Sequence, residues 1–149
     1  MHGNTSNTDR LPTVVLVDDD EESLRLIQNR LAKARVKNPV VVFRSGVEFL
    51  GRLADDEDTG ADFLDHSCLM LLDLLMPGVN GLDVLGWLHA RPLLNKPVIV
   101  MLSYCDDPEA ISRARELGAH TYLLKYPSAE TLAALVHYAE MDAPLHHRP

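Results

Sequence analysis

Short apolar runs alternate with longer amphipathic stretches along most of the chain. An apolar run without polar alternation indicates a strand buried on both faces, whereas apolar residues three or four positions apart indicate one face of a helix. Repeated in this order, the two patterns predict strand–helix units and a parallel sheet covered by helices. The five predicted strands are Val14–Val17, Val40–Phe43, Cys68–Leu72, Val98–Leu102 and Tyr122–Leu124.

Start and stop signals support the helices between these runs. Asp107 before Pro108 suits the N-cap and first turn of the fourth helix, and Gly118 suits the left-handed residue that ends it. Ser128 is expected to cap the fifth helix. The acidic stretch Asp55–Ser67 is predicted to be a longer exposed loop.

Composition fits one globular domain. The chain has 149 residues, of which 46% are hydrophobic and 24% charged, values that disfavour disorder and membrane insertion. A net charge of -8 disfavours direct binding to nucleic acid or to an anionic membrane.

Residues 1–12 and 142–149 are expected to be tails. Cys68 and Cys105 are interpreted as buried free thiols, which suits a reducing cytoplasm.

Polar side chains follow the predicted strands at the point where each strand ends. The carboxyl ends of parallel strands meet at one edge of the sheet, where ligands of open α/β folds bind. Mg²⁺ favours a few carboxylates together with water and phosphate oxygens, and an ammonium and a hydroxyl can hold further phosphoryl oxygens. The pattern therefore predicts a metal-assisted oxyanion site. The residues at the strand exits are Asp18, Asp19, Asp20, Asp73, Ser103 and Lys125.

The same residues, in this order, resemble a known family. From Thr13 to Met141 the chain is similar to the response-regulator receiver domain of the CheY-like type, so 13–141 is the predicted domain. The resemblance implies a doubly wound, flavodoxin-like (βα)5 sandwich whose five parallel strands have the order 2-1-3-4-5. The matching positions are Asp18-Asp19, Asp73 with Met76-Pro77 and Gly81, Ser103, Tyr122 and Lys125.

The resemblance also implies a role for each acidic residue. Asp73 would be the phosphoacceptor, a carboxylate nucleophile that takes a phosphoryl group from a phosphohistidine. Asp18 and Asp19 would hold Mg²⁺ together with Asp73 and the backbone carbonyl of Leu75. Asp20 is interpreted mainly as an N-cap of the first helix.

Three further side chains receive roles by the same resemblance. Ser103 would bond one phosphoryl oxygen and Lys125 would neutralise another. Tyr122 would be an aromatic switch that turns inward as Ser103 moves, which shifts the population between two conformations.

The chain departs from the family pattern in three places. A proline usually follows the lysine directly, often through a cis peptide, but Tyr126 stands between Lys125 and Pro127. Leu75 and Cys105 occupy positions from which an amide or acid could orient a hydrolytic water, so we expect slow loss of the phosphoryl group.

As a receiver, the chain would be a stand-alone response regulator in the cytoplasm. A sensor histidine kinase or a phosphotransfer protein would supply the phosphoryl group, and the output would be protein contacts. The face from 107 to 141 would make these contacts and could form a homodimer. Apart from assisting its own phosphorylation and dephosphorylation, the protein is not expected to be an enzyme.

Two other functions remain open at this point. Asp18-x-Asp20 after an apolar strand also fits a phosphatase of the haloacid-dehalogenase type, with Asp18 as the nucleophile. Glu22 and the lack of a downstream acidic pair argue against that class. A pseudo-receiver, which keeps the fold as an interaction module without phosphorylation, is the second alternative.

Overall fold

Strands and helices alternate along the whole described chain. The computed structural model describes residues 11–55, 67–91 and 97–146. All five predicted strands are confirmed, each to within one residue at either end. The strands are β1 (Thr13–Val17), β2 (Val40–Phe43), β3 (Cys68–Asp73), β4 (Val98–Ser103) and β5 (Thr121–Leu124). The helices are α2 (Glu21–Lys33), α3 (Gly46–Asp55), α4 (Gly81–His89), α5 (Pro108–Glu116) and α6 (Ala129–His146).

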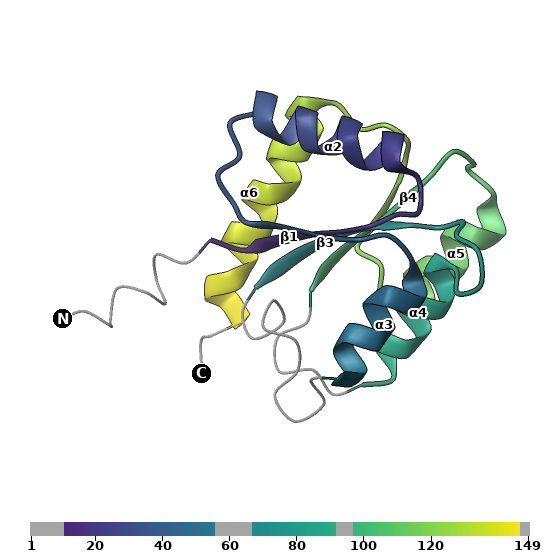
Figure 1. The fold of residues 1–149 in the computed structure, drawn as a ribbon. Coiled ribbons are helices and arrows are strands. Elements are labelled where there is room, and N and C mark those ends of the chain that lie inside the picture. The colour runs from purple at the N-terminus through teal and green to yellow at the C-terminus, as the bar shows by residue number, and fades with distance from the viewer. Residues whose placement is uncertain (1–10, 56–66, 92–96, 147–149) are drawn as a thin grey trace.

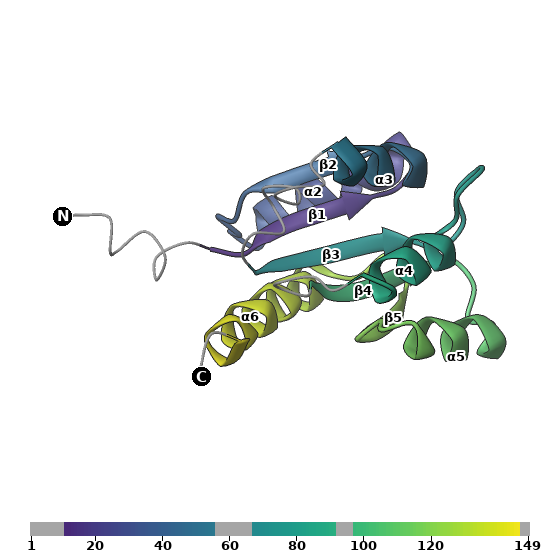
Figure 2. The same cartoon turned by 90° about the horizontal axis from the view of Figure 1, so that it is seen from below.

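The sheet has the expected order. Its five strands are all parallel and run β2-β1-β3-β4-β5, with β3 at the centre, as Figure 2 shows. The register aligns the carboxyl ends: Val17 pairs with Leu72, and Ser103 pairs with Leu124. Continued by one residue, the first pairing brings Asp18 beside Asp73. The topology therefore places the polar strand exits at one edge.

Helices cover both faces of the sheet (Figure 1). On one face α2 and α6 pack over strand residues such as Leu16 and Leu71, while α3, α4 and α5 pack over Val17 and Leu72 on the other. Successive strand residues point to opposite faces, so both faces must be apolar. This double burial explains why the strands read as unbroken apolar runs.

The observed caps match the sequence signals. Asp107 caps α5 with Pro108 in its first turn, and Gly118 has a φ of 105° just after that helix. The Ser128 hydroxyl accepts from the backbone N–H of Thr131 at the start of α6.

One boundary differs from the expectation. Helix α6 ends at His146, so the stretch 142–146 is helical rather than part of a tail. The predicted loop Asp55–Ser67 and the predicted tail 1–12 lie mostly outside the described residues.

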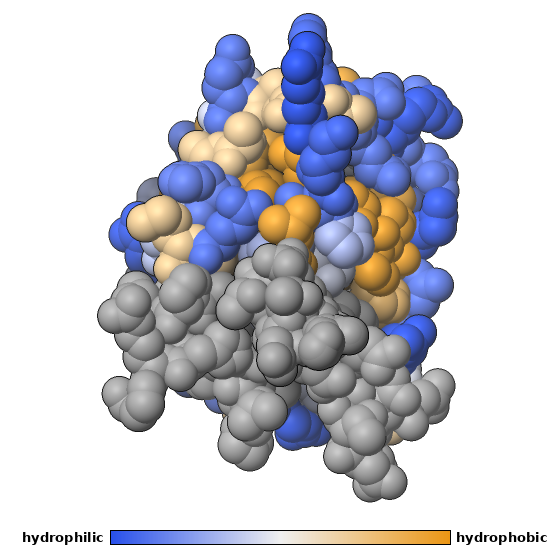
Figure 3. All heavy atoms as spheres, turned by 90° about the vertical axis from the view of Figure 1, so that its left-hand side faces the viewer, coloured by the Kyte–Doolittle hydropathy of each residue, from blue (hydrophilic) through white to orange (hydrophobic). Residues whose placement is uncertain are grey.

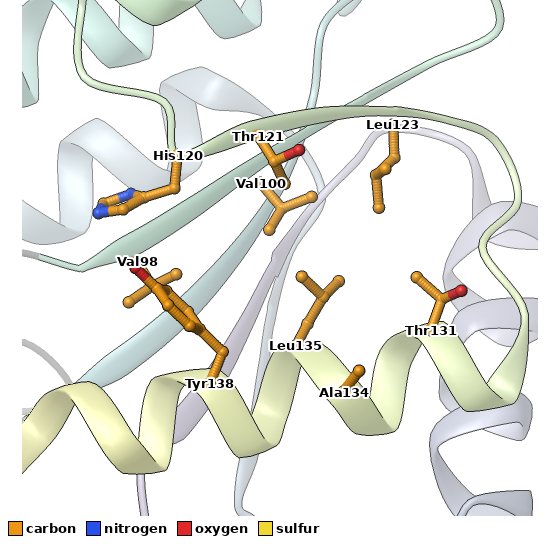
Figure 4. A pocket seen from close by; sticks show the side chains of 9 residues that line it. All are labelled: Val98, Val100, His120, Thr121, Leu123, Thr131, Ala134, Leu135 and Tyr138. Carbon is orange, nitrogen blue, oxygen red and sulfur yellow. The ribbon is translucent and has the colours of Figure 1, made fainter.

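Two further surfaces lie away from the carboxyl edge. Figure 3 views the edge where the strands begin, and apolar patches are visible there among hydrophilic side chains. An apolar pocket of about 500 Å³ lies between β4, β5 and α6, with Leu123 and Leu135 pointing into it (Figure 4).

Within the described part of the chain, no helix has both the length and the hydropathy for crossing a membrane.

Candidate functional site

A small cavity, lined mostly by polar residues, opens at the carboxyl edge of the sheet. Its volume is about 160 Å³, and side chains from the ends of β1, β3, β4 and β5 surround it. The topology thus brings together most of the residues that the sequence singled out. The cavity is lined by Asp19, Asp20, Asp73, Leu75, Ser103, Tyr104 and Lys125.

Asp73 is the last residue of β3 and is buried, with only 6% of its surface exposed. Burial raises the pKa of its carboxyl to about 6, and the nearby charge of Asp18 adds to this, while the Lys125 ammonium opposes both. At neutral pH the group is therefore mainly an ionised carboxylate, but a more basic one than an exposed aspartate. Such a carboxylate carries the charge that a nucleophile needs and is largely shielded from solvent.

Lys125 links two of the carboxylates. Its side chain is only 2% exposed, and Nζ lies 2.8 Å from Oδ2 of Asp18 and 3.1 Å from Oδ1 of Asp73. Burial favours the neutral amine, but the hydrogen bond to Asp18 and the attraction of both carboxylates raise the pKa of Lys125. The ammonium is therefore charged at neutral pH and compensates part of the buried negative charge.

Three carboxylates are close enough to share one cation. Asp18, Asp19 and Asp73 each offer an oxygen, and these oxygens lie within 4.8 Å of one another. Carboxylate oxygens in this number suit Mg²⁺, which keeps several waters as further ligands. The donor set fits the predicted metal, and the role of the Leu75 carbonyl stays a prediction.

Asp20 lies beside this cluster but has a different task. Its side chain accepts from the backbone N–H of Glu22 at 3.1 Å, and it is the N-cap of α2. The prediction that Asp20 mainly begins the helix is confirmed.

The side chains of Ser103 and Tyr122 both form hydrogen bonds with the backbone of Cys105, two residues after the end of β4. The Cys105 N–H donates to Oγ of Ser103 at 3.1 Å, and the Tyr122 hydroxyl donates to the Cys105 carbonyl at 2.7 Å. One residue of the β4–α5 loop thus connects the two side chains expected to switch. Cys105 itself is exposed, so the prediction that both thiols are buried is wrong for this residue. Cys68 is buried, and burial raises the pKa of its thiol to about 12.

The peptide bond between Lys125 and Tyr126 is cis. It occupies the position at which the family often has a cis bond before proline.

Sequence reasoning missed three hydroxyl groups beside the lysine. The Tyr126 hydroxyl lies 2.7 Å from Oγ of Ser23 and also bonds the hydroxyl of Tyr104. Oγ of Ser23 lies 3.3 Å from the Lys125 ammonium. Only one local signal pointed to this cluster: Ser23 stands three residues after Asp20, which places both at the start of one helix.

Gly81 explains how the loop after β3 packs against the acceptor. Its N–H donates to the Leu74 carbonyl at 2.8 Å. A Cβ at this position would lie 2.4 Å from the backbone oxygen of Asp73, which no side chain tolerates without movement. The first residue of α4 must therefore be glycine for the chain to turn this closely past Asp73.

Comparison with protein families agrees with this geometry. The family model of the response regulator receiver domain matches residues 14–137, nearly the whole chain. The chain belongs to the response regulator receiver domain family. Members of this family are signalling proteins that accept a phosphoryl group in two-component systems. The match decides against the haloacid-dehalogenase alternative, in which Asp18 was the nucleophile.

Known receivers resemble this one along most of its length. The nitrate/nitrite response regulator protein NarL of Escherichia coli K12 is 34% identical over 128 residues, which are 86% of this chain and 55% of that protein. The chain thus spans about half the length of NarL.

Solved receiver structures have the same fold. A response regulator receiver domain from Rhodospirillum rubrum superposes with a TM-score of 0.69 and 30% identity, covering 89% of this chain and 94% of that one. The bacteriophytochrome response regulator AtBRR also gives 0.69, with 28% identity over 90% of this chain and 94% of its own.

Proposed function

We propose that Asp73 is the phosphoacceptor of this receiver, and that Lys125, Ser103 and a Mg²⁺ ion assist the transfer. The observation that carries the proposal is the arrangement around Asp73: a buried carboxylate lies 3.1 Å from an ammonium, beside two further carboxylates and an open cavity. A structural ion pair alone needs neither the cavity nor the additional acids.

The transfer requires one bond to form and one to break. An oxygen of the Asp73 carboxylate attacks the phosphorus of a phosphohistidine, and the bond from phosphorus to the imidazole nitrogen breaks. The nitrogen keeps the electron pair and takes up a proton. The Lys125 ammonium and the Ser103 hydroxyl both line the cavity and would bond the phosphoryl oxygens as these take up charge.

Asp18, Asp19 and Asp73 would hold Mg²⁺, with the Leu75 carbonyl as a further ligand. When bound, the ion neutralises charge on the phosphoryl oxygens. The remaining positive charge at the site is that of Lys125, which the structure fixes between Asp18 and Asp73. The protein thus supplies the nucleophile, one cation and the ligands of a second cation.

Labelling with a small phosphodonor tests this proposal. Acetyl phosphate with Mg²⁺ is expected to add one phosphoryl group to the wild type, and Asp73→Asn is expected to abolish the addition, as seen by intact-mass spectrometry. Asp106→Asn is the matched control, because this carboxylate is exposed in the β4–α5 loop and does not line the cavity. Labelling that survives Asp73→Asn would contradict the assignment.

The same experiment decides the pseudo-receiver alternative. A pseudo-receiver would show no Mg²⁺-dependent labelling of the wild type and no response to beryllofluoride, which mimics an acyl phosphate. The complete set of three carboxylates and the lysine favours the phosphorylated form.

We further propose that phosphorylation acts on the β4–α5 loop. If Oγ of Ser103 turns to a phosphoryl oxygen, the Cys105 N–H loses its partner, and the bond from Tyr122 to the Cys105 carbonyl is strained or broken. Tyr122 would then turn inward. Beryllofluoride should shift the backbone NMR signals of this loop in the wild type, and Tyr122→Phe should reduce the shift without reducing acceptor labelling.

The donor would be a sensor histidine kinase or a histidine phosphotransfer protein in the cytoplasm, a compartment that suits the free thiols Cys68 and Cys105. The output would be protein contacts of the face 107–141, formed by α5, β5 and much of α6. Exposed apolar side chains on this face include Leu124 and Tyr138. A homodimer through this face would double the mass in light scattering after phosphorylation, and an unchanged mass at every concentration would argue against it.

A further inference from the structure

The Lys125 ammonium has three hydrogen-bond acceptors around it. Oδ2 of Asp18 lies at 2.8 Å, Oδ1 of Asp73 at 3.1 Å and Oγ of Ser23 at 3.3 Å. A lysine ammonium has three N–H donors and no acceptor, so this set uses all of them. Ser23 is fully buried, on the first turn of α2. Among these three acceptors, Ser23 supplies the neutral one.

Hydrogen-bond counting fixes the direction of the Ser23 hydroxyl. The hydroxyl donates to Oδ2 of Asp20 at 3.0 Å, which uses its only proton. Its two lone pairs are then left for two donors, the Lys125 ammonium and the Tyr126 hydroxyl. Tyr126 must therefore donate to Ser23, and its own oxygen accepts the proton of Tyr104. The bonds run in one direction, from Tyr104 through Tyr126 and Ser23 to Asp20.

Tyr126 is itself held in place from two sides. Its ring meets that of Tyr104 edge to face, with centroids 5.7 Å apart, and the residue also packs against the core cluster beneath α2 and α6. Nη1 of Arg30 on α2 donates to the carbonyls of Tyr126 and Pro127 at 3.2 Å and 2.9 Å. The turn after Lys125 is therefore tied to α2 through its backbone and through the tyrosine hydroxyl.

We propose that Ser23 and Tyr126 are positioning residues for Lys125 in the phosphoryl transfer proposed above. Ser23 accepts one N–H of the ammonium, and Tyr126 keeps the Ser23 oxygen in place. Only one N–H of Lys125 is then directed at the acceptor, toward the position that a phosphoryl oxygen would take. The tyrosine that stands between Lys125 and Pro127 thus has a task at the site rather than only in the turn. The inference rests on the proposed function for its rate effect, but its geometric part concerns the resting protein.

The first test measures the ammonium in the resting protein, with EDTA and without a phosphodonor. In 15N NMR spectra the Nζ protons of Lys125 should exchange slowly with water, because the side chain is buried and fully bonded. Ser23→Ala should speed this exchange by about threefold to tenfold, the loss that one hydrogen bond represents. Tyr126→Phe should have a smaller effect in the same direction. If the Nζ protons of Lys125 exchange in both variants at the wild-type rate, the proposal is overturned.

The second test measures the rate of Asp73 labelling by acetyl phosphate. Ser23→Ala should slow it by about threefold to tenfold, and Tyr126→Phe by less. In the double variant, Tyr126→Phe should add nothing to Ser23→Ala, because both act through one oxygen. Additive effects would overturn the coupling. Tyr138→Phe is the control, since it removes a phenolic hydroxyl from α6 outside the site.

The Mg²⁺ affinity of Ser23→Ala distinguishes a role in positioning Lys125 from a general distortion of the site. If Ser23 only orients the ammonium, Ser23→Ala should leave the affinity within about twofold, which is less than one hydrogen bond represents. A parallel loss of affinity and rate would show a distorted site and overturn the positioning role. A wild type that no donor labels at Asp73 would instead refute the proposed function, and the exchange measurement would still decide the geometry.

Discussion

Replacing Gly81 with alanine should disturb the acceptor more than its small size suggests. Gly81 begins α4 and lies directly beneath the end of β3. An added Cβ would meet the Asp73 oxygen at 2.4 Å and Cα of Leu74 at 3.0 Å, and both are backbone atoms. Since backbone cannot rotate away as a side chain does, either α4 or the residue that carries the acceptor must move.

The magnitude follows from two opposing effects. Forcing an extra carbon into a packed site costs about 1–3 kcal/mol and occasionally more, and contact with backbone places this case at the upper end. Alanine in a helix regains up to ~1 kcal/mol over glycine. We therefore expect Gly81→Ala to lower the free energy of unfolding by about 2 kcal/mol. In urea, a slope of ~2 kcal/mol/M converts this into a midpoint lower by about 1 M.

Gly86 provides the matched control on the same helix. Apart from its chain neighbours and the backbone of its own helix, no heavy atom of the described residues lies within 4 Å of a Cβ built there, so Gly86→Ala should be neutral or stabilise by about 0.5–1 kcal/mol. Urea unfolding of the wild type and both variants, followed by circular dichroism, measures the difference. Acetyl phosphate labelling of Gly81→Ala should also be slower, because Asp73 is displaced. Equal stability of the two alanine variants would refute the close approach of α4 to Asp73.

Three further predictions concern the charges and the lifetime of the modified state. The pKa of Asp73 rises from 3.8 to about 6 on folding, so the ionised form lowers stability at neutral pH by up to ~3 kcal/mol. In EDTA, Asp73→Asn should therefore raise the free energy of unfolding at about pH 7.5. This increase should shrink as the pH falls through 6 and vanish near 4. An increase that does not depend on pH would contradict the raised pKa of Asp73. Mg²⁺ at about a hundred times its Kd should add ~2.7 kcal/mol to the free energy of unfolding, as measured by thermal unfolding. Asp19→Asn should lose most of this stabilisation, and Asp106→Asn should keep it. Equal stabilisation of both variants by Mg²⁺ would rule out the carboxylate cluster as the metal site. The acyl phosphate should persist for minutes or longer because neither Leu75 nor Cys105 can orient water, and Leu75→Asn should shorten the lifetime measured by phosphate release; a wild-type lifetime of seconds would overturn this explanation.

The positions of the strands could be predicted because burial on both faces leaves a simple pattern. A strand such as Cys68–Asp73 has no solvent-facing side, so its residues must all be apolar until the carboxylate at its end. Parallel topology then brings sequence-distant exits to one edge. The sequence pattern therefore sufficed to predict one shared site for Asp18, Asp73, Ser103 and Lys125.

Local environments could not be predicted in the same way. Cys105 follows a buried strand by only two residues, yet it is exposed because the β4–α5 loop turns out of the sheet there. Helix α6 ends at His146 rather than at Met141, since local signals fix the end of a helix only loosely. Whether a residue near an element's end is buried depends on the path of the following chain, which strand patterns do not encode.

The fold class and the residues that gather at the carboxyl edge could be predicted from the amino-acid pattern, and the family resemblance implied the strand order. These properties depend on the period of apolar residues and on the ends of strands, and both are local in the chain. Which side chains form hydrogen bonds with one another could be seen only in the folded domain. Tyr126 read as a departure from the family pattern, but Ser23 and Tyr104, distant from it in sequence, bond its hydroxyl. Hydrogen bonds depend on tenths of an ångström and on direction, and these are set by packing of the whole domain.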